Sequence, residues 1–485
     1  MSLSSTLSNA LSGLTVASRK AELVSSNVAN ASTDGYGRRV METTAASIGG
    51  RGAGVEIVGV SRIVDAQVLE DRRLAGADLA ASQTNLTFWT NLELAIGDVE
   101  SDYGLSGRLN SFETALVEAA SRPDSDVRLQ NVLDSATALS DALNSVSDEI
   151  QTRRSQADAD IASQVDLLNS RLVQIADLNH SIRVAQGNGQ DALALMDQRQ
   201  TLVDDVSEIV PIRIVQGEQG DISLFTATGA TLVSGGHTAE FGFAATGTIV
   251  PEMSVGTGAL SGLSLNGEPI DSLGPHSPVA GGSLAALFEV RDITSVDAQS
   301  ELDAVARNLI ARFEGGIDPT LASGDAGLFT DAGAALDPSL EVGLASRIAI
   351  NDLVVPENGG DLWRLRSGLG ATSPGDSGDS TLFQAYASAL NDPQTADSGR
   401  FSTISRSFSG MLSEFGAYVS QNRVTAEDTT AFAASRHDTL QLAELAQGVD
   451  TDQELQNLLL IEQAYAANAK VVEIVDQMIE SLMRI

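Results

Sequence analysis

The sequence contains no cysteine among its 485 residues, and only 4% of them are aromatic. The absence of cysteine excludes disulfides, thiol nucleophiles and thiolate metal sites. Because aromatic side chains are scarce, we expect cores built from aliphatic residues and alanine, as in long helical bundles. Lysine is also nearly absent, since Lys20 and Lys470 are the only two in the chain.

Basic residues are outnumbered, 29 against 65 acidic ones, which gives a formal net charge of −36. Such a surface repels phosphate backbones and anionic lipid headgroups. We therefore expect neither nucleic acid nor a membrane as a partner. No run approaches the ~18–20 apolar residues needed to cross a bilayer. The first charge is Arg19, and polar residues interrupt any apolar core before it, so we expect no cleaved secretory signal.

No group of residues predicts catalysis, cofactor binding or a metal site. The four histidines are scattered and lack metal-binding spacing. The glycine-rich stretches lack the strand–loop–helix context of a nucleotide site. Paired carboxylates such as Asp204 and Asp205 point around a helix rather than toward one another. We therefore predict no catalytic residue, no metal, no cofactor and no enzymatic activity.

What the sequence does contain is an apolar seam near each end, with residues at alternating steps of three and four. This spacing places side chains on one narrow stripe of a helix, which is typical of coiled-coil partners. The seams are Leu3, Leu7, Ala10, Leu14, Ala17, Ala21, Val24 and Val28, and then Leu458, Ile461, Tyr465, Asn468, Val472, Val475, Ile479 and Leu482. We predict that the two ends pair with each other or with other subunits, and the pattern leaves open which.

The regions between the seams are predicted from periodicity and turn residues. Thr451–Glu454 has the pattern of a capping box and is expected to begin the final helix. The expected elements, in chain order, are a helix over 3–30, a short β-hairpin within 38–68, helices over 67–209, strands over 211–283, a helix over 283–313, a turn-rich part with a strand near 348–355, and a helix from Phe401 to Ala446.

These elements predict an α+β multidomain fold that is elongated, with three layers. Residues 1–35 and 448–485 are expected to form a terminal helical coiled-coil layer. Residues 36–210 and 401–447 are expected to form a helical-bundle layer with a short β-hairpin. Residues 211–400 are expected to form an outer β-rich domain with an internal helix near 283–314.

The segment from Ser26 to Arg38 resembles a signature of the bacterial flagellar axial proteins, the family of rod, hook and hook-associated proteins. In that family the signature A-N-x-x-T-P-G-Y follows the first helix. The matching residues are Ala29, Asn30, Thr33, Gly35 and Tyr36, and Asp34 stands in place of the proline.

Other segments resemble the hook-associated members of this family more than its hook or rod members. They are the Asn-Ala-Ser-Thr core of the signature, residues 448–471, 195–203 and 282–287. The resemblance implies a structural protein that joins hook to filament and provides the platform for filament assembly. It also implies an extracellular location at the hook–filament junction, reached by type III export without a cleaved signal. A hook or distal-rod protein of the same family is the alternative, and a surface enzyme or adhesin is the alternative of a different class.

The partners implied by the resemblance are further copies of the chain in a ring, the hook protein and the next hook-associated protein on the filament side. The flagellar type III export apparatus and an export chaperone that binds the C-terminal helix complete the set. Together, the seams and the resemblance predict an assembly interface of Leu3, Leu7, Leu14, Val24, Val28, Asn30, Thr33, Gly35, Tyr36, Leu458, Ile461, Tyr465, Asn468, Val472, Val475, Ile479 and Leu482.

Overall fold

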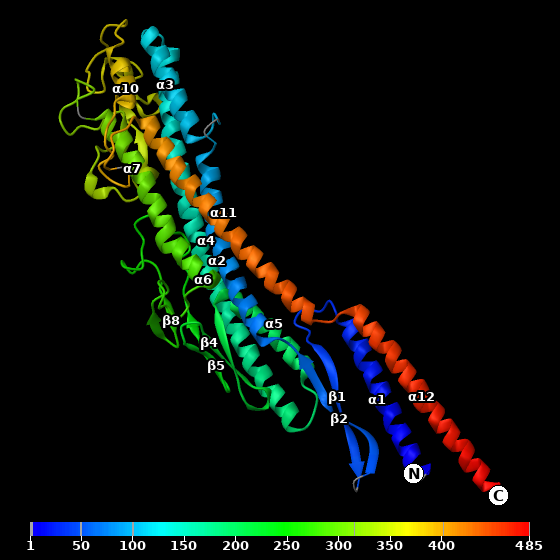
Figure 1. Ribbon diagram of the computed structural model, residues 1–485. Coiled ribbons are helices and arrows are strands. Elements are labelled where there is room, and N and C mark those ends of the chain that lie inside the picture. The colour runs from blue at the N-terminus through cyan, green and yellow to red at the C-terminus, as the bar shows by residue number, and fades with distance from the viewer. Residues whose placement is uncertain (1–2, 49–50, 99–100, 315, 401, 485) are drawn as a thin grey trace. The chain divides into compact units, whose positions relative to one another are not determined.

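The computed structural model describes residues 3–48, 51–98, 101–314, 316–400 and 402–484 (Figure 1). The chain is mostly helical, with several small antiparallel sheets, which confirms the α+β class. It forms two compact units. Unit 1 comprises Met1–Asp78, Leu168–Ala239 and Ala433–Ile485, and unit 2 comprises Leu79–Leu167 and Glu240–Phe432. The division into three layers stays a prediction.

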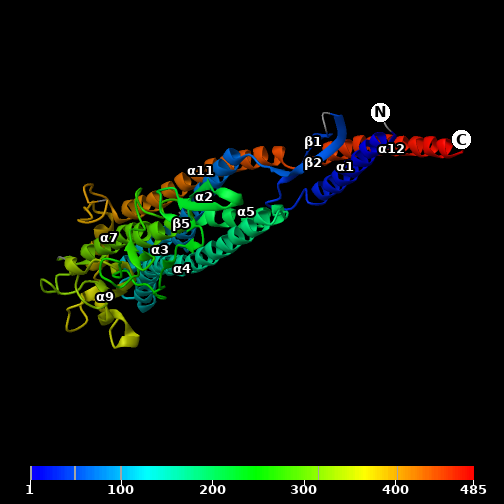
Figure 2. The ribbon, with the colours of Figure 1, turned by 90° about the horizontal axis from the view of Figure 1, so that it is seen from below.

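Unit 1 contains both terminal helices. Helices α1 (Leu3–Ala29) and α12 (Thr451–Met483) lie side by side and run antiparallel (Figures 1 and 2). The predicted hairpin, β1 (Arg38–Ile48) and β2 (Arg51–Ile63), packs against α1. The other elements of unit 1 are α5 (Leu193–Ile209), the antiparallel sheet β3 (Ile212–Gln216), β4 (Ile222–Thr226), β5 (Thr231–Ser234) and β6 (His237–Thr238), the 3-10 turn Glu218–Gly220, and parts of α2 (Ala66–Ile96), α4 (Asp126–Gly187) and α11 (Phe408–Gln447).

Unit 2 contains the remaining parts of α2, α4 and α11, and a core of phenylalanines. Phe313 packs edge-on against Phe329 at 4.9 Å between ring centroids, and Phe112 lies 5.7 Å from Phe329. The other elements of unit 2 are α3 (Leu105–Ser121), β7 (Phe241–Gly242), β8 (Leu263–Leu265), β9 (Glu268–Ile270), α6 (Gly282–Glu289), α7 (Ser295–Phe313), β10 (Phe329–Asp331), α8 (Leu344–Arg347), β11 (Ile348–Ile350), α9 (Arg364–Ser367), α10 (Thr381–Asn391) and three 3-10 turns within 338–358.

The long helix α4 lies within residues 67–209, where helices were predicted. No glycine or proline occurs between Asp126 and Gln186, so nothing in that stretch interrupts the helix. Apolar residues at steps of three and four are fully buried along it, from Val132 to Ile182. The helix ends at Gly187.

The structure differs from the prediction in three of the helices. The helix expected from Phe401 begins at Phe408, because Gln394 and Arg406 pair as an extended bridge just before it; Phe401 itself lies outside the described residues. The helix expected over 283–313 contains a π-helical turn, Val290–Thr294, where the buried Arg291 pairs with Asp158 at 2.7 Å. The third difference concerns the cap of the final helix.

The cap of α12 is Asp450 rather than Thr451. The Asp450 carboxylate accepts hydrogen bonds from the backbone N–H groups of Asp452 and Gln453, at 2.9 and 3.1 Å. A carboxylate at this position satisfies N–H groups that the helix leaves unpaired and interacts favourably with the helix dipole. Helix α12 therefore begins at Thr451, as predicted, and its N-cap residue is Asp450.

Candidate assembly interface and motif junction

The two predicted terminal seams face each other in unit 1. Ala10, Ala17 and Val24 on α1 are buried, as is Val475 on α12. A side chain at Gly13 would lie 2.8 Å from the Asn468 Oδ1 atom, so the absence of a side chain there leaves room for the asparagine. The seam contact is therefore intramolecular, and one polar residue in an apolar seam favours a single register.

The seam on α12 extends beyond the described part of α1. Because the helices run antiparallel and Gly13 faces Asn468, Leu3 at the start of α1 is level with about Met478. Ile479 is therefore close to the level of Leu3 and is 37% exposed, whereas Leu482 lies about one turn past the described start of α1 and is 61% exposed.

A second apolar stripe runs along α12, one residue before six of the eight seam positions. It was not predicted. Its members are Leu460, Ala464, Ala467, Val471, Ile474 and Met478, all exposed. Leu460 is 63% exposed and Met478 50%. This stripe keeps the alternating steps of four and three, so it forms a continuous apolar face beside the seam.

The signature after the first helix is fixed by an asparagine that was not among the predicted residues. Asn27, at the end of α1, is 1% exposed. Its side-chain amide donates to the Arg39 carbonyl at 2.9 Å and accepts from the Arg39 N–H at 3.1 Å. It also accepts a hydrogen bond from the Tyr36 hydroxyl at 2.9 Å. The asparagine therefore closes the loop between α1 and β1 by binding both of its sides.

Asp197 on α5 binds the other side of this loop. Its carboxylate accepts hydrogen bonds from the Gly37 N–H at 3.1 Å, from Arg39 at 3.0 Å and from Arg62 at 2.7 Å. Arg62 also donates to the Gly35 carbonyl at 2.9 Å and to Gln200. We call Asn27, Gly35–Arg39, Arg62, Asp197 and Gln200 the motif junction.

Two of its glycines are required by geometry. Gly35 has a φ of 74°, and a Cβ there would lie 2.6 Å from the Thr201 hydroxyl. A Cβ on Gly37 would lie 2.3 Å from the Arg62 side chain. Any other residue at these two positions would therefore push α5 or Arg62 away from the loop.

The C-terminal motif contacts the same region of unit 1. Arg38 donates to Gln453 on α12 at 3.2 Å. Arg72 on α2 pairs with Asp204 on α5 at 2.8 Å and with Glu444 on α11. Burial lowers the pKa of Arg72, but the two carboxylates outweigh burial and hold it above its usual value. The three segments whose sequences resemble flagellar axial proteins, near 26–38, 195–203 and 448–471, thus lie around one set of contacts.

The predicted interface residues differ in their exposure. Val24 and Val475 are buried, and Thr33, Tyr465, Ile479 and Leu482 are exposed. The others are half-buried, namely Leu3, Leu7, Leu14, Val28, Asn30, Gly35, Tyr36, Leu458, Ile461, Asn468 and Val472.

Chemical sites were searched for within the described residues. There, no group of three or more histidine, aspartate or glutamate side chains is arranged to hold a metal ion. None of the described helices is long and apolar enough to cross a membrane.

Comparison with known proteins identifies the family to which this chain is similar. Residues 89–315 match the model of the flagellar hook-associated protein FlgK helical domain. Residues 7–36 match the model of flagella basal body rod protein, and residues 445–485 match that of the flagellar basal body rod FlgEFG protein C-terminal region. The chain belongs to the flagellar hook-associated protein 1 family. It is a structural flagellar protein and not an enzyme.

Full-length relatives support this membership. Flagellar hook-associated protein 1 of Bacillus subtilis (strain 168) is 23% identical, over 94% of this chain and 93% of the relative. Its namesake in Escherichia coli (strain K12) is 23% identical over the whole of both chains. That of Salmonella typhimurium is 29% identical over 54% of this chain and 51% of the relative. The solved structure of the flagellar hook junction protein FlgK from Burkholderia pseudomallei aligns over 54% of this chain and 47% of that one, with 21% identity and a TM-score of 0.44.

Proposed function

We propose that the chain joins hook to filament through the exposed face of its paired terminal helices. As a member of its family it is a hook–filament junction protein of the extracellular flagellum. The observation that carries the proposal is the second apolar stripe of α12. The seam of α12 is already engaged with α1, and the stripe beside it is exposed. A continuous exposed apolar face on a helix is unfavourable in water and favours contact with another chain.

The occupant proposed for this stripe is the terminal helix pair of a neighbouring copy in a ring. Charge supports this choice. The side of α12 turned away from the stripe has a row of carboxylates, Glu462, Glu473, Asp476 and Glu480. Arg19 and Lys20 are the only cations on α1, so the α1 of one copy is complementary to the α12 of the next.

The proposed contact surface of α12 also includes Ile479 and Leu482, near its C-terminal end. Ile479 is close to the level of the described start of α1, Leu482 lies past it, and both are exposed, so a subunit stacked above or below could cover them. Hook protein and the next hook-associated protein are the partners proposed for the two ends of such a ring. The same exposed helix is proposed as the segment that an export chaperone covers before assembly, and the type III export apparatus as the route.

A hook or distal-rod role is the second candidate. The rod-protein models match only 7–36 and 445–485, whereas the hook-associated model matches 227 consecutive residues between them, from 89 to 315. This difference favours a hook–filament junction protein over a hook or distal-rod protein.

The role itself is tested by a deletion strain viewed by electron microscopy. We expect hooks without filaments, with flagellin released into the medium. Normal filaments, or cells without hooks, would contradict the assignment.

Substitutions at two neighbouring alanines of α12 test whether the exposed stripe contacts another copy of the chain. Ala467 belongs to the exposed stripe, and Ala466, also exposed, lies about 100° around the helix from it. Ala467→Glu would bury an unpaired carboxylate at every contact between copies, at several kcal/mol each, so we expect filament-bearing hooks to fall at least about tenfold. Ala466→Glu makes the same chemical change and should leave assembly intact. Equal effects would overturn the proposed surface, and circular dichroism of both monomers checks that the helix is kept.

A further inference from the structure

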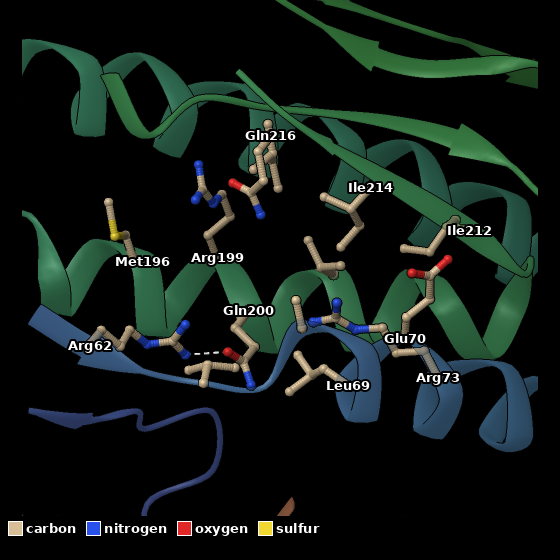
Figure 3. Close-up of a pocket in the computed structure, with 14 residues that line it drawn as sticks. Arg62, Leu69, Glu70, Arg73, Met196, Arg199, Gln200, Ile212, Ile214 and Gln216 are labelled. Carbon is tan, nitrogen blue, oxygen red and sulfur yellow. Dashed lines mark hydrogen bonds between the residues drawn. The ribbon is translucent and has the colours of Figure 1, made fainter. Parts of the chain in front are cut away.

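A cavity of about 280 Å³ opens in unit 1 between the start of α2, α5 and β3 (Figure 3). That is many times the ~30 Å³ that a water molecule occupies in the liquid. Its apolar wall is made by Leu69, Val203, Ile212 and Ile222, each no more than 5% exposed. The cavity is therefore large enough for a small organic molecule with an apolar body.

Arginines line the other side of the cavity. Arg73 and Arg199 are each 7% exposed, and Arg62 lies beside them (Figure 3). Arg73 uses Nε to bind Asp204 at 2.6 Å. Arg199 uses one terminal nitrogen to bind the Asn179 side chain at 2.7 Å and the Gly220 carbonyl at 2.8 Å. The other guanidinium nitrogens of Arg73 and Arg199 bind no described residue, so donors remain available toward the cavity.

The charges around the cavity are unbalanced. Glu70 is the one carboxylate in the lining, against three guanidinium groups. The nearest further carboxylates are shared, because Asp197 also binds Arg39 and Asp204 also binds Arg72. Within the described residues no carboxylate lies within ion-pair distance of Arg199, and burial lowers its pKa to about 10.

We propose that this cavity binds a carboxylate carried on a short aliphatic stem. The carboxylate would accept hydrogen bonds from Arg199 and Arg73, since a planar carboxylate fits the guanidinium fork. The stem would lie against Ile212 and Ile222. An inorganic anion such as phosphate would leave this apolar wall uncovered.

Binding would also affect the motif junction, because Arg62 lines the cavity and holds the Gly35 carbonyl and Asp197. A bound carboxylate that offsets the charge of the arginine cluster should therefore stabilise the loop after α1. Hydrogen exchange of residues 35–39 should slow when the cavity is occupied.

The test measures thermal unfolding of the full chain by circular dichroism, with hexanoate as the probe. We expect a saturable rise in the unfolding temperature at millimolar hexanoate, and no rise with 1-hexanol, phosphate or the same concentration of sodium chloride. Arg199→Gln removes one positive charge from the cavity lining. Ile214→Phe fills part of the cavity and leaves all of its arginines unsubstituted. Each should weaken hexanoate binding by about tenfold or more.

The matched control is Arg213→Gln, on the same strand but with its side chain exposed, which should bind hexanoate like the unaltered chain. A shift that does not saturate, a shift of equal size with 1-hexanol, or an equal loss in Arg213→Gln would overturn the proposal.

The ligand has two possible sources, a free aliphatic acid or a glutamate side chain of another copy. The second source rests on the assembly proposed above, whereas hexanoate binding to the monomer does not. Cells that produce the Ile214→Phe variant distinguish the two. Fewer filaments than in Arg213→Gln cells identify the side chain of a neighbour, and equal numbers identify the free acid.

Discussion

Replacing Asp197 by asparagine should loosen the connection between the terminal helices and the rest of unit 1. The Asp197 carboxylate accepts hydrogen bonds from the Gly37 N–H and from two arginines, Arg39 and Arg62. Asparagine has nearly the same size, but it is neutral and offers one acceptor oxygen in place of two. Both arginines would then lose their carboxylate while they stay largely buried, at 17% and 16% exposure.

The expected cost follows from these contacts. Hydrogen bonds to a charged group contribute about 1.5–3 kcal/mol each, and breaking a fully buried ion pair costs about 3–5 kcal/mol. Because the site is partly open to water, we take the lower end, about 3 kcal/mol. That corresponds to roughly a 100-fold increase in the fraction of molecules whose loop is open.

Hydrogen exchange measures this opening directly, because the amide of Gly37 is itself bound to Asp197. We expect exchange of residues 35–39 to accelerate about 100-fold in Asp197→Asn. The matched control is Asp205→Asn on the same helix. Asp205 pairs with Arg171 at 3.0 Å, but both side chains are about a third exposed, so this pair contributes only about 0–1 kcal/mol. If the two variants exchange alike at residues 35–39, the motif junction does not hold the loop.

Three further predictions concern both units. Phe112→Ala should lower the free energy of unfolding of unit 2 by about 3–5 kcal/mol, because Phe112 is fully buried among aromatic rings. Val117→Ala on the same helix, at 64% exposure, should change it by under about 0.5 kcal/mol. Urea unfolding followed by tryptophan fluorescence measures both changes, since both tryptophans lie in unit 2. Burial raises the pKa of Asp303 from 3.8 to about 6, so its protonation contributes about 3 kcal/mol below pH 3.8 that is lost as pH rises through about 6. The urea midpoint should therefore fall between about pH 4 and about pH 6 more steeply than in Asp303→Asn, and equal slopes would refute this. Limited proteolysis of the monomer should cut α12, in which only Glu454 and Val475 are buried, before it cuts the helices of unit 2. A fully protected α12 would contradict this prediction.

The terminal seams could be predicted because they depend on local spacing. Apolar residues at steps of three and four lie on one side of a helix whatever it packs against. The pattern could not decide between an intramolecular and an intermolecular contact. That needed the pairing of Gly13 with Asn468, which also shows why Leu482, past the described start of α1, is exposed.

The contacts of Asp197 could not be predicted, because they join residues that are 135 to 160 positions apart in the sequence. Local periodicity contains no information about such pairs. The motif of residues 195–203 was noticed only as a resemblance, and nothing in it indicated that its aspartate binds the loop after α1. The second stripe of α12 obeys the same spacing rule as the seam, but alanines at two of its positions make it less apparent than the aliphatic seam beside it.

The shift in the cap of α12 has a simple physical cause. Thr451 and Glu454 fit the capping-box pattern, but Asp450 precedes them and is an equally good N-cap residue. Its carboxylate binds two backbone N–H groups of the first turn, so the helix begins at Thr451. Two adjacent capping candidates cannot be separated by sequence pattern alone.

Photo-crosslinking of assembled flagella tests most directly whether the exposed stripe of α12 contacts another subunit. Because the chain has no cysteine, Ala467→Cys provides a single attachment point for a maleimide-linked photoreactive group, and Ala466→Cys is the matched control. We predict crosslinked products larger than one chain from Ala467→Cys in isolated hook–filament junctions, few from Ala466→Cys, and none from either monomer. Equal crosslinking from both positions, or none from Ala467→Cys in junctions that do assemble, would contradict the proposal that this stripe joins the subunits.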